Sequence, residues 1–330
     1  MQQNVRAKRK VPPIVPRRPL EPPFPNGPCG GTVLTIPPEE TFGIDVNLAT
    51  VNIGGDFILP PRPLKVWLPP DYQNASQHPT LYVHDGQNAM EDMESWTGTS
   101  WRLMGALTRM ADHGMLRFSH MPIVVLLPSI EGDFLPGVRR RHLEYGDSNF
   151  PFARAHADFV ARTVKPLVDA RFRTDPSAEA TFVMGTSLGG QASLHLMLRH
   201  PDLFGGAACL SPAFGPNLIN EVSRSAANNK NGKSPLQSKR IYLDIGGDLS
   251  DVTVPWVDVL DHLTSEHWWN PGYFWLDTQL QSSVSSMKRA LDQAGADYRL
   301  EQFPGGRHNE RAWAQRVHVP LIHLLGKDET

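Results

Sequence analysis

The sequence predicts an α/β fold in which a mostly parallel central sheet carries helices on both faces. Two observations predict it. Short apolar runs bounded by Pro, Gly or Asp recur along the 330 residues, and stretches with apolar residues at helical spacing lie between several of them. Strands that alternate with helices form parallel sheets, because each helix crosses over one face and returns the chain to the same edge. The length is sufficient for one large domain with a full core.

The strands and helices can be assigned in order. The apolar runs that predict strands are residues 64–68, 80–84, 123–127, 181–184, 206–210, 241–245 and 298–303. The patterns that predict helices are residues 101–112, 153–171, 188–199, 276–294 and 311–325. Pro166 lies inside the second helical pattern, where its missing N–H and its ring should kink or divide the helix. Since the carboxyl ends of parallel strands share one edge of the sheet, we expect the active groups to gather there.

The domain organisation follows from shifts in composition. Residues 1–31 are rich in proline and contain no acidic residue before Glu21, which predicts a basic arm that is disordered or extended. Residues 32–330 are expected to form a single domain. Within it, residues 220–239 are rich in Asn, Lys and Ser and predict a polar surface loop. Residues 268–275 are strongly aromatic and predict either a pocket wall or core packing.

Charge and cysteine content narrow the possible partners. A formal net charge of -2 gives no general reason to bind nucleic acid or an anionic membrane, and no segment is long and apolar enough to span a bilayer. Cys29 and Cys209 lie far apart and follow no metal or redox spacing, which favours a reducing compartment and hence the cytoplasm. No His, Asp and Glu cluster has metal-ligand spacing, so neither a metal nor an organic cofactor is expected. A small diffusible substrate is the simplest expectation.

The pentapeptide Gly185-Thr186-Ser187-Leu188-Gly189 carries the clearest chemical signal. It follows the predicted strand 181–184 directly and begins the predicted helix 188–199. A strand that turns sharply into a helix at a serine strains that residue, and glycines two positions away on either side avoid the resulting clashes. The pattern therefore predicts a nucleophile elbow that exposes the Ser187 hydroxyl. The alternative is a glycine-rich turn that only packs a helix closely on the sheet.

A serine hydroxyl needs a neighbouring base, and His308 is the strongest of the thirteen histidines. It lies in a glycine-rich loop after the last predicted strand and before the final helix. In enzymes with a nucleophile elbow on such a sheet, the three catalytic residues follow one another along the chain in the order serine, acid, histidine. His308 therefore lies where the base is expected. His195 and His200 lie along the helix that leaves the elbow and point away from its start, so we interpret them as structural.

The acid that orients the histidine is less clearly marked. Asp248 is the first choice, because it follows two glycines that permit a tight turn at the end of strand 241–245. Asp244 lies within that strand, and Asp251 lies further along the loop. Asp277 stands at the start of the next helix, where an N-cap or first-turn role stabilised by the helix dipole is expected. The choice among the four stays open at this point.

Two backbone N–H groups are needed to stabilise an oxyanion beside Ser187. The helix that starts at the elbow offers the N–H of Leu188. The loop after strand 80–84 offers a second donor from Gly86 or Gln87. Without the elbow, that loop would be interpreted as an ordinary Asp-Gly turn.

Taken together, several segments resemble the putative-esterase branch of the α/β-hydrolases, which includes enterochelin-esterase-like and feruloyl-esterase-like enzymes. The likeness spans roughly residues 60 to 325. The segments that carry it are Val66–Tyr72, Leu81–Asn88, Gly185–Gly190, Leu210–Phe214 and Gly305–Trp313. The resemblance implies an α/β-hydrolase fold and a serine esterase with Ser187 as nucleophile and His308 as base.

The expected function is a cytoplasmic hydrolase of carboxylic esters that acts on a small-molecule substrate through a covalent acyl-enzyme. Ser187, His308 and Asp248 would form its catalytic triad, with no cofactor. Two alternatives remain. An acyltransferase would admit an alcohol in place of water, and a catalytically silent protein on the same scaffold would use the basic arm for binding.

Overall fold

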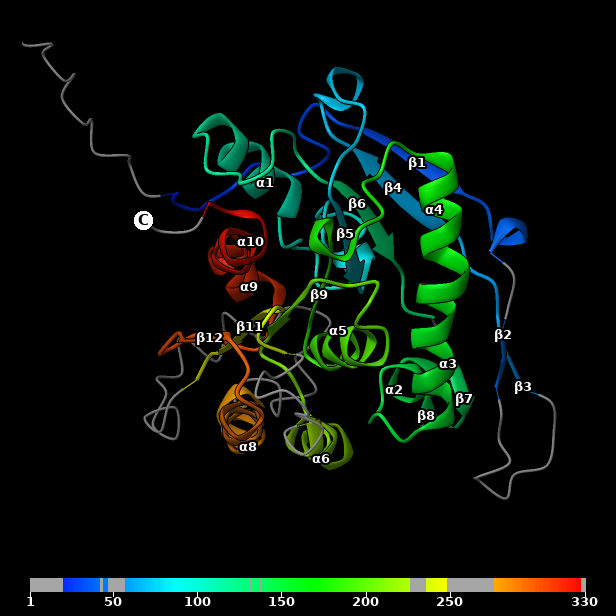
Figure 1. The fold of residues 1–330 in the computed structure, drawn as a ribbon, viewed down its shortest axis with the longest axis vertical. Helices are drawn as coiled ribbons and strands as arrows, with labels where there is room; N and C mark the ends of the chain where they lie inside the picture. Colours follow the sequence, from blue (N-terminus) through cyan, green and yellow to red (C-terminus); the bar gives the residue numbers. More distant parts are fainter. Residues whose placement is uncertain are drawn as a thin grey trace, which may run out of the picture.

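The computed structural model describes residues 20–41, 44–46, 57–130, 132–136, 138–225, 236–247 and 276–327. An eight-stranded sheet runs through its centre (Figure 1). Strand β4 is antiparallel to both of its neighbours, and the remaining adjacent pairs are parallel, so the predicted mostly parallel sheet is confirmed. In spatial order the strands are β1 Thr32–Ile36, β4 Leu64–Leu68, β6 Ile123–Leu127, β5 Thr80–His84, β9 Thr181–Thr186, β10 Gly206–Leu210, β11 Arg240–Ile245 and β12 Tyr298–Gln302.

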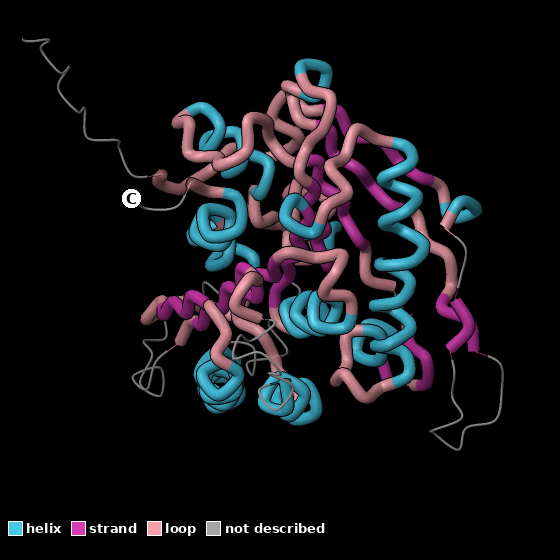
Figure 2. The backbone as a smooth tube through the Cα atoms, viewed as in Figure 1, coloured by secondary structure: helices cyan, strands magenta, loops and turns pink. Residues whose placement is uncertain are grey.

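Helices surround this sheet (Figure 2). They are α1 Leu103–Asp112, α2 Arg140–Glu144, α3 Pro151–Phe159, α4 Lys165–Arg171, α5 Leu188–Arg199, α6 Pro216–Ser225, α8 Leu276–Ala294, α9 Glu310–Arg316 and α10 His318–Leu325. Within the described residues, two small antiparallel sheets accompany them, formed by β2 Ile44–Val46 with β3 Phe57–Leu59 and by β7 Asp133–Leu135 with β8 Val138–Arg139. Within the described residues, no helix combines the length and the apolarity that crossing a bilayer requires.

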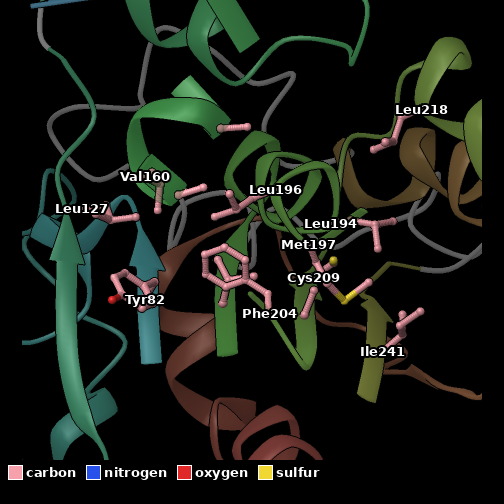
Figure 3. Packing of buried hydrophobic residues seen from close by; sticks show 14 of the residues in the cluster. Tyr82, Leu127, Val160, Leu194, Leu196, Met197, Phe204, Cys209, Leu218 and Ile241 are labelled. Carbon is pink, nitrogen blue, oxygen red and sulfur yellow. The ribbon is translucent and has the colours of Figure 1, made fainter. Parts of the chain in front are cut away.

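The sheet separates two hydrophobic cores because side chains along a strand alternate between its faces. In β9, Val183 packs into one core, whereas Phe182 and Met184 pack into the other. The first core includes side chains of α3, α5, α6 and α8, and Figure 3 shows part of it around Tyr82 and Phe204. The second core includes side chains of α1 and α10. Both faces of the sheet are therefore covered, as the sequence predicted.

Two predicted helices are divided. The pattern over residues 153–171 becomes α3 and α4, joined by a π-helical turn over Val160–Val164 that ends just before Pro166. Pro166 cannot donate to the carbonyl four residues earlier, which explains the irregular turn. The pattern over residues 311–325 becomes α9 and α10. Pro320 cannot donate to the carbonyl of Arg316, and α9 ends at that residue.

The polar loop expected over residues 220–239 begins as a helix. Helix α6 extends to Ser225, and Leu218 and Val222, four residues apart on one face of it, are fully buried. The loop interpretation is therefore wrong for residues 220–225. The many polar residues of this segment mask the narrow apolar stripe of the helix when the composition is taken as a whole. Residues 226–235 of the expected loop, and the aromatic stretch over 268–275, lie outside the described residues.

The expected disordered arm over residues 1–31 is also corrected in part, because residues 20–31 pack on the domain. The side chains of Leu20 and Phe24 are buried in the second core. The guanidinium of Arg102 donates to the Phe24 carbonyl at 3.2 Å, and the guanidinium of Arg109 lies 5.6 Å from the Phe24 ring centroid. The prediction treated residues 1–31 as one segment, although the basic residues lie before Leu20 and the buried apolar side chains come after them. Residues 1–19 lie outside the described part of the chain.

Candidate active site

The turn from β9 into α5 has the geometry of a nucleophile elbow. Ser187 has φ 55° and ψ −125°, a conformation that L-residues rarely adopt. A Cβ atom on Gly185 would lie 2.5 Å from the carbonyl carbon of Gly189, and one on Gly189 would lie 3.0 Å from Oδ2 of Asp85. Gly185 is thus required by the close approach of the Gly189 backbone, and Gly189 leaves room for the Asp85 side chain. The strained serine stands between the two glycines at the carboxyl end of β9.

Two side chains from distant parts of the sequence form a hydrogen-bonded series with this serine. His308 Nε2 lies 2.9 Å from Ser187 Oγ, and His308 Nδ1 lies 2.7 Å from Asp277 Oδ1. His308 follows β12 in the loop before α9, and Asp277 stands in the first turn of α8. Because both His308 and Asp277 are almost fully buried, water competes little for these contacts. The geometry is that of a serine, histidine and aspartate triad.

Within the described residues, the carboxylate partner of His308 is Asp277, whereas Asp248 was the first choice from the sequence. Asp248 and Asp251 lie outside the described residues, and Asp244 does not contact His308 in any described hydrogen bond. Asp244, Asp248 and Asp251 all lie within a few residues of the end of β11, where the sequence predicts the acid. In the fold, the start of α8 also lies at that strand end, where Asp277 Oδ2 accepts the backbone N–H of Gly246 at 3.1 Å.

The electrostatic setting favours the ionised form of Asp277. Burial alone would raise the pKa of this carboxyl group. Hydrogen bonding from His308 and the nearby charges of His308 and Arg316 outweigh burial and bring the pKa below its ordinary value. The carboxylate can therefore hold one tautomer of the imidazole and stabilise the imidazolium when it forms.

The loop that should supply the second oxyanion donor lies against the first turn of α5. It forms a short 3₁₀ turn over Gly86–Asn88, preceded by Asp85 in the left-handed conformation with φ 54°. Arg141 holds Asp85 through two hydrogen bonds of 2.8 and 2.6 Å, and the Gln87 amide donates to Ser129 Oγ at 3.0 Å. Hydrogen bonds to Arg141 and Ser129 thus fix the position of this loop. Gln87 and Leu188 stay predicted as the two backbone donors.

A second buried carboxyl group, Glu310, lies two residues after His308. Its side chain is only slightly exposed, and burial raises its pKa to about 7. A hydrogen bond with Thr97 and the charge of Arg141 act in the opposite direction. Nothing in the sequence marks this group, because a glutamate in the first turn of a helix is usually solvated and stabilised by the helix dipole.

The histidines interpreted as structural lie away from Ser187 Oγ. His195 is buried, and burial lowers its pKa to about 4. His200 Nε2 lies 2.8 Å from Asp158 Oδ1. No group of three or more His, Cys, Asp or Glu side chains in the described part of the chain is arranged to hold a metal ion.

The comparisons with solved structures match the whole fold at low sequence identity. The BES protein from Bacillus cereus has 13% identity and a TM-score of 0.55, over 98% of this chain and 100% of that protein. A ferulic acid esterase from Anaeromyces mucronatus, solved with ferulic acid, has 15% identity and a TM-score of 0.54, over 88% and 89% of the two chains. The enterobactin esterase from Shigella flexneri has 16% identity and a TM-score of 0.53. This chain covers 63% of that enzyme, which covers 94% of this chain.

A search among curated proteins found no match. The family model described as "Putative esterase" matches residues 60–324, which is most of the chain. That range contains β9, α5, α8 and the loop that carries His308. The chain therefore belongs to the putative esterase family.

Proposed function

We propose that this protein is a serine hydrolase of carboxylic esters that works through a covalent acyl-enzyme. One observation carries the proposal: the hydrogen-bonded series from Ser187 Oγ through His308 to Asp277, with distances of 2.9 and 2.7 Å. Membership of the putative esterase family supports ester chemistry. The strained backbone at Ser187 supports a nucleophilic role, since such strain persists where the surrounding structure enforces it.

In the first half-reaction, Ser187 Oγ attacks the ester carbonyl carbon while His308 Nε2 takes the hydroxyl proton. The Asp277 carboxylate stabilises the imidazolium that results. The negative charge that develops on the carbonyl oxygen would be met by the backbone N–H groups of Leu188 and Gln87. His308 then gives its proton to the departing alcohol, and the acyl group stays on Ser187.

In the second half-reaction, water replaces the alcohol. His308 takes a proton from the water as it attacks the acyl carbonyl, and the bond from that carbon to Ser187 Oγ then breaks. The proton returns to the serine oxygen, and the carboxylic acid leaves. The substrate is proposed to be a small-molecule ester, in line with the ferulic acid and enterobactin esterases among the structural neighbours. The cytoplasmic setting stays a proposal, supported by Cys29 and Cys209 as free thiols.

A fluorophosphonate probe tests the proposal, because it reacts with activated serines. We expect the wild-type protein to be labelled at Ser187 and to hydrolyse p-nitrophenyl acetate. Ser187→Ala should lose both properties. Ser193→Ala is the matched control, since this buried serine on the same helix contacts His84 and not His308.

Folded wild-type protein that takes no label and hydrolyses no short ester would contradict the proposal and support a silent scaffold. Labelling at a serine other than Ser187 would contradict the assignment of the nucleophile. Mass spectrometry of the labelled peptide distinguishes the two results.

A further inference from the structure

A buried polar network is bonded to the second carboxylate oxygen of Asp277. While Oδ1 faces His308, Oδ2 accepts the hydroxyl of Ser211 at 3.0 Å and the backbone N–H of Gly246 at 3.1 Å. Ser211 is fully buried just after β10 and has φ 43°. The carboxylate is thus held from the ends of two neighbouring strands as well as by its own helix.

The direction of the Ser211 hydroxyl follows from its neighbours. Its oxygen lies 2.6 Å from Arg316 Nη2 and 3.3 Å from Trp313 Nε1. Both of these groups can only donate hydrogen bonds, so the hydroxyl oxygen must accept from them. Its single hydrogen is then left for Asp277 Oδ2. Ser211 therefore links Trp313 and Arg316 of α9 by hydrogen bonds to the carboxylate that orients His308.

One buried cation in this network faces two buried carboxylates. The side chain of Arg316 is 3% exposed, and its Nη2 lies 3.2 Å from Asp244 Oδ1 and 3.9 Å from Asp277 Oδ2. Asp244 is nearer and is fully buried in β11, where it also accepts the backbone N–H of Ser211 at 3.0 Å. The Tyr242 hydroxyl lies 3.3 Å from its other oxygen. These contacts make Asp244 the closer partner of the guanidinium.

The net charge of this network determines how easily His308 can be protonated. With Asp244 and Asp277 ionised, Arg316 leaves one net negative charge while the imidazole is neutral. When His308 takes the serine proton, the four groups together become neutral. Without Asp244, the guanidinium would instead cancel Asp277 and oppose the imidazolium. Burial raises the pKa of Asp244 above its ordinary value, and the guanidinium of Arg316 limits that rise, so the carboxylate form depends on Arg316.

We propose that Asp244 is the counter-ion of Arg316 and acts as a positioning residue, so that the charge of Asp277 is left to His308. The inference rests on the proposed function, because it assumes that His308 is the base. It also gives a role to the aspartate that the sequence placed inside the strand. Arg316 and Ser211 hold Asp277 in place. Asp244 neutralises the guanidinium, so that the Asp277 carboxylate is free to pair with the imidazolium.

The test measures how the rate of fluorophosphonate labelling at Ser187 depends on pH, together with the melting temperature. Asp244→Asn should move the acidic limb of the profile to lower pH by roughly one unit, because the unopposed guanidinium disfavours protonation of the imidazole. The labelling rate on the plateau should fall about tenfold. The double variant Asp244→Asn with Arg316→Met removes both charges, and its acidic limb should return to the wild-type position.

A merely structural role would change the melting temperature and the plateau rate but would not move the pH of the acidic limb, even though removing both partners of a buried ion pair can restore stability. Asp158→Asn is the matched control, because Asp158 pairs with Arg199 away from the triad, and its acidic limb should not move. An Asp244→Asn profile with the wild-type limb would overturn the proposal. So would a double variant whose limb stays with that of the single variant.

Two further outcomes remain decisive. If Asp244→Asn does not fold, Arg316→Met alone carries the test, and its limb should lie at the wild-type pH or above it. A limb below the wild-type pH would overturn the proposal. Failure of the wild-type protein to label at Ser187 would instead contradict the proposed function, so the two failures are distinguishable.

Discussion

Gly246 donates its backbone N–H to Oδ2 of Asp277 at 3.1 Å, although 31 residues separate them in sequence. The end of β11 and the start of α8 therefore meet at the edge of the sheet where Ser187 stands. A Cβ atom on Gly246 would collide with the same carboxylate, so only glycine fits this close approach. The contact brings the Asp277 carboxylate to the strand end that the sequence predicted for the acid.

Replacing Asp277 by asparagine should remove most of the esterase rate while leaving the fold intact. Without the carboxylate, the imidazole is held in the wrong tautomer, and the corresponding change in a serine protease lowers kcat by about 10⁴-fold. We expect a loss of roughly that size in p-nitrophenyl acetate hydrolysis. The melting temperature should fall by only a few degrees.

Asp248→Asn and Asp251→Asn are the matched controls for this prediction, because each removes a carboxylate from the segment between Gly246 and Asp277. Both variants should keep the rate within about tenfold of wild type, a barrier change of about 1.4 kcal/mol or less. An Asp248→Asn variant that lost as much activity as Asp277→Asn would show that the acid assignment is wrong.

Gly185→Ala should damage the elbow more than an ordinary glycine substitution would. The added Cβ would lie 2.5 Å from the carbonyl carbon of Gly189, so β9 and α5 would have to separate. Overpacking of this kind costs about 1–3 kcal/mol, and the displaced serine should lose most of its labelling by a fluorophosphonate. Thermal unfolding and the labelling rate measure the two effects.

Gly114→Ala provides the comparison, because Gly114 has a left-handed backbone conformation but no atom lies within 4 Å of an added Cβ. Its φ of 62° makes alanine cost about 1 kcal/mol, with no effect on labelling. Equal labelling rates in Gly185→Ala and the wild type would refute the close-packing argument.

Phe24→Ala should destabilise the domain, even though Phe24 precedes the first strand. The ring is 1% exposed and packs against α1 and α10, so its loss should cost about 3 kcal/mol. Phe150, which is 46% exposed, gives a matched control that should cost under about 1 kcal/mol. Urea denaturation measures both, and equal costs would argue against docking of residues 20–31.

Glu310→Gln should stabilise the protein at neutral and alkaline pH. The folded-state pKa of about 7 lies above the ordinary 4.5, so the protonated group contributes stability below pH 4.5 that is lost as pH rises to about 7. Because glutamine cannot ionise, the variant should gain about 3 kcal/mol relative to wild type across this window. Urea denaturation at pH 4.5 and pH 8 measures the gain.

Glu39→Gln removes an exposed carboxyl group and should show no such gain between the two pH values. If the difference in stability between Glu310→Gln and wild type were the same at pH 4.5 and pH 8, Glu310 would not be the buried acid that the structure indicates.

The parts of the site that the sequence could predict are those fixed by local backbone sterics. Gly185, Ser187 and Gly189 form one continuous turn, so their spacing specifies its geometry wherever a strand meets a helix. His308 could be chosen because it lies in a short loop between β12 and α9. The tertiary contact then brings its Nε2 within 2.9 Å of Ser187 Oγ.

The sequence by itself determined the mostly parallel sheet, its two covered faces and the strained serine, because alternation of side chains and glycine spacing act over a few residues. Only the tertiary structure decided that Asp277 meets His308 and that Asp244 pairs with Arg316. Both contacts join residues that lie far apart in sequence, so no local residue pattern marks them. The choice among several aspartates therefore depended on which carboxylate the folded chain brings to the buried cation and to the imidazole.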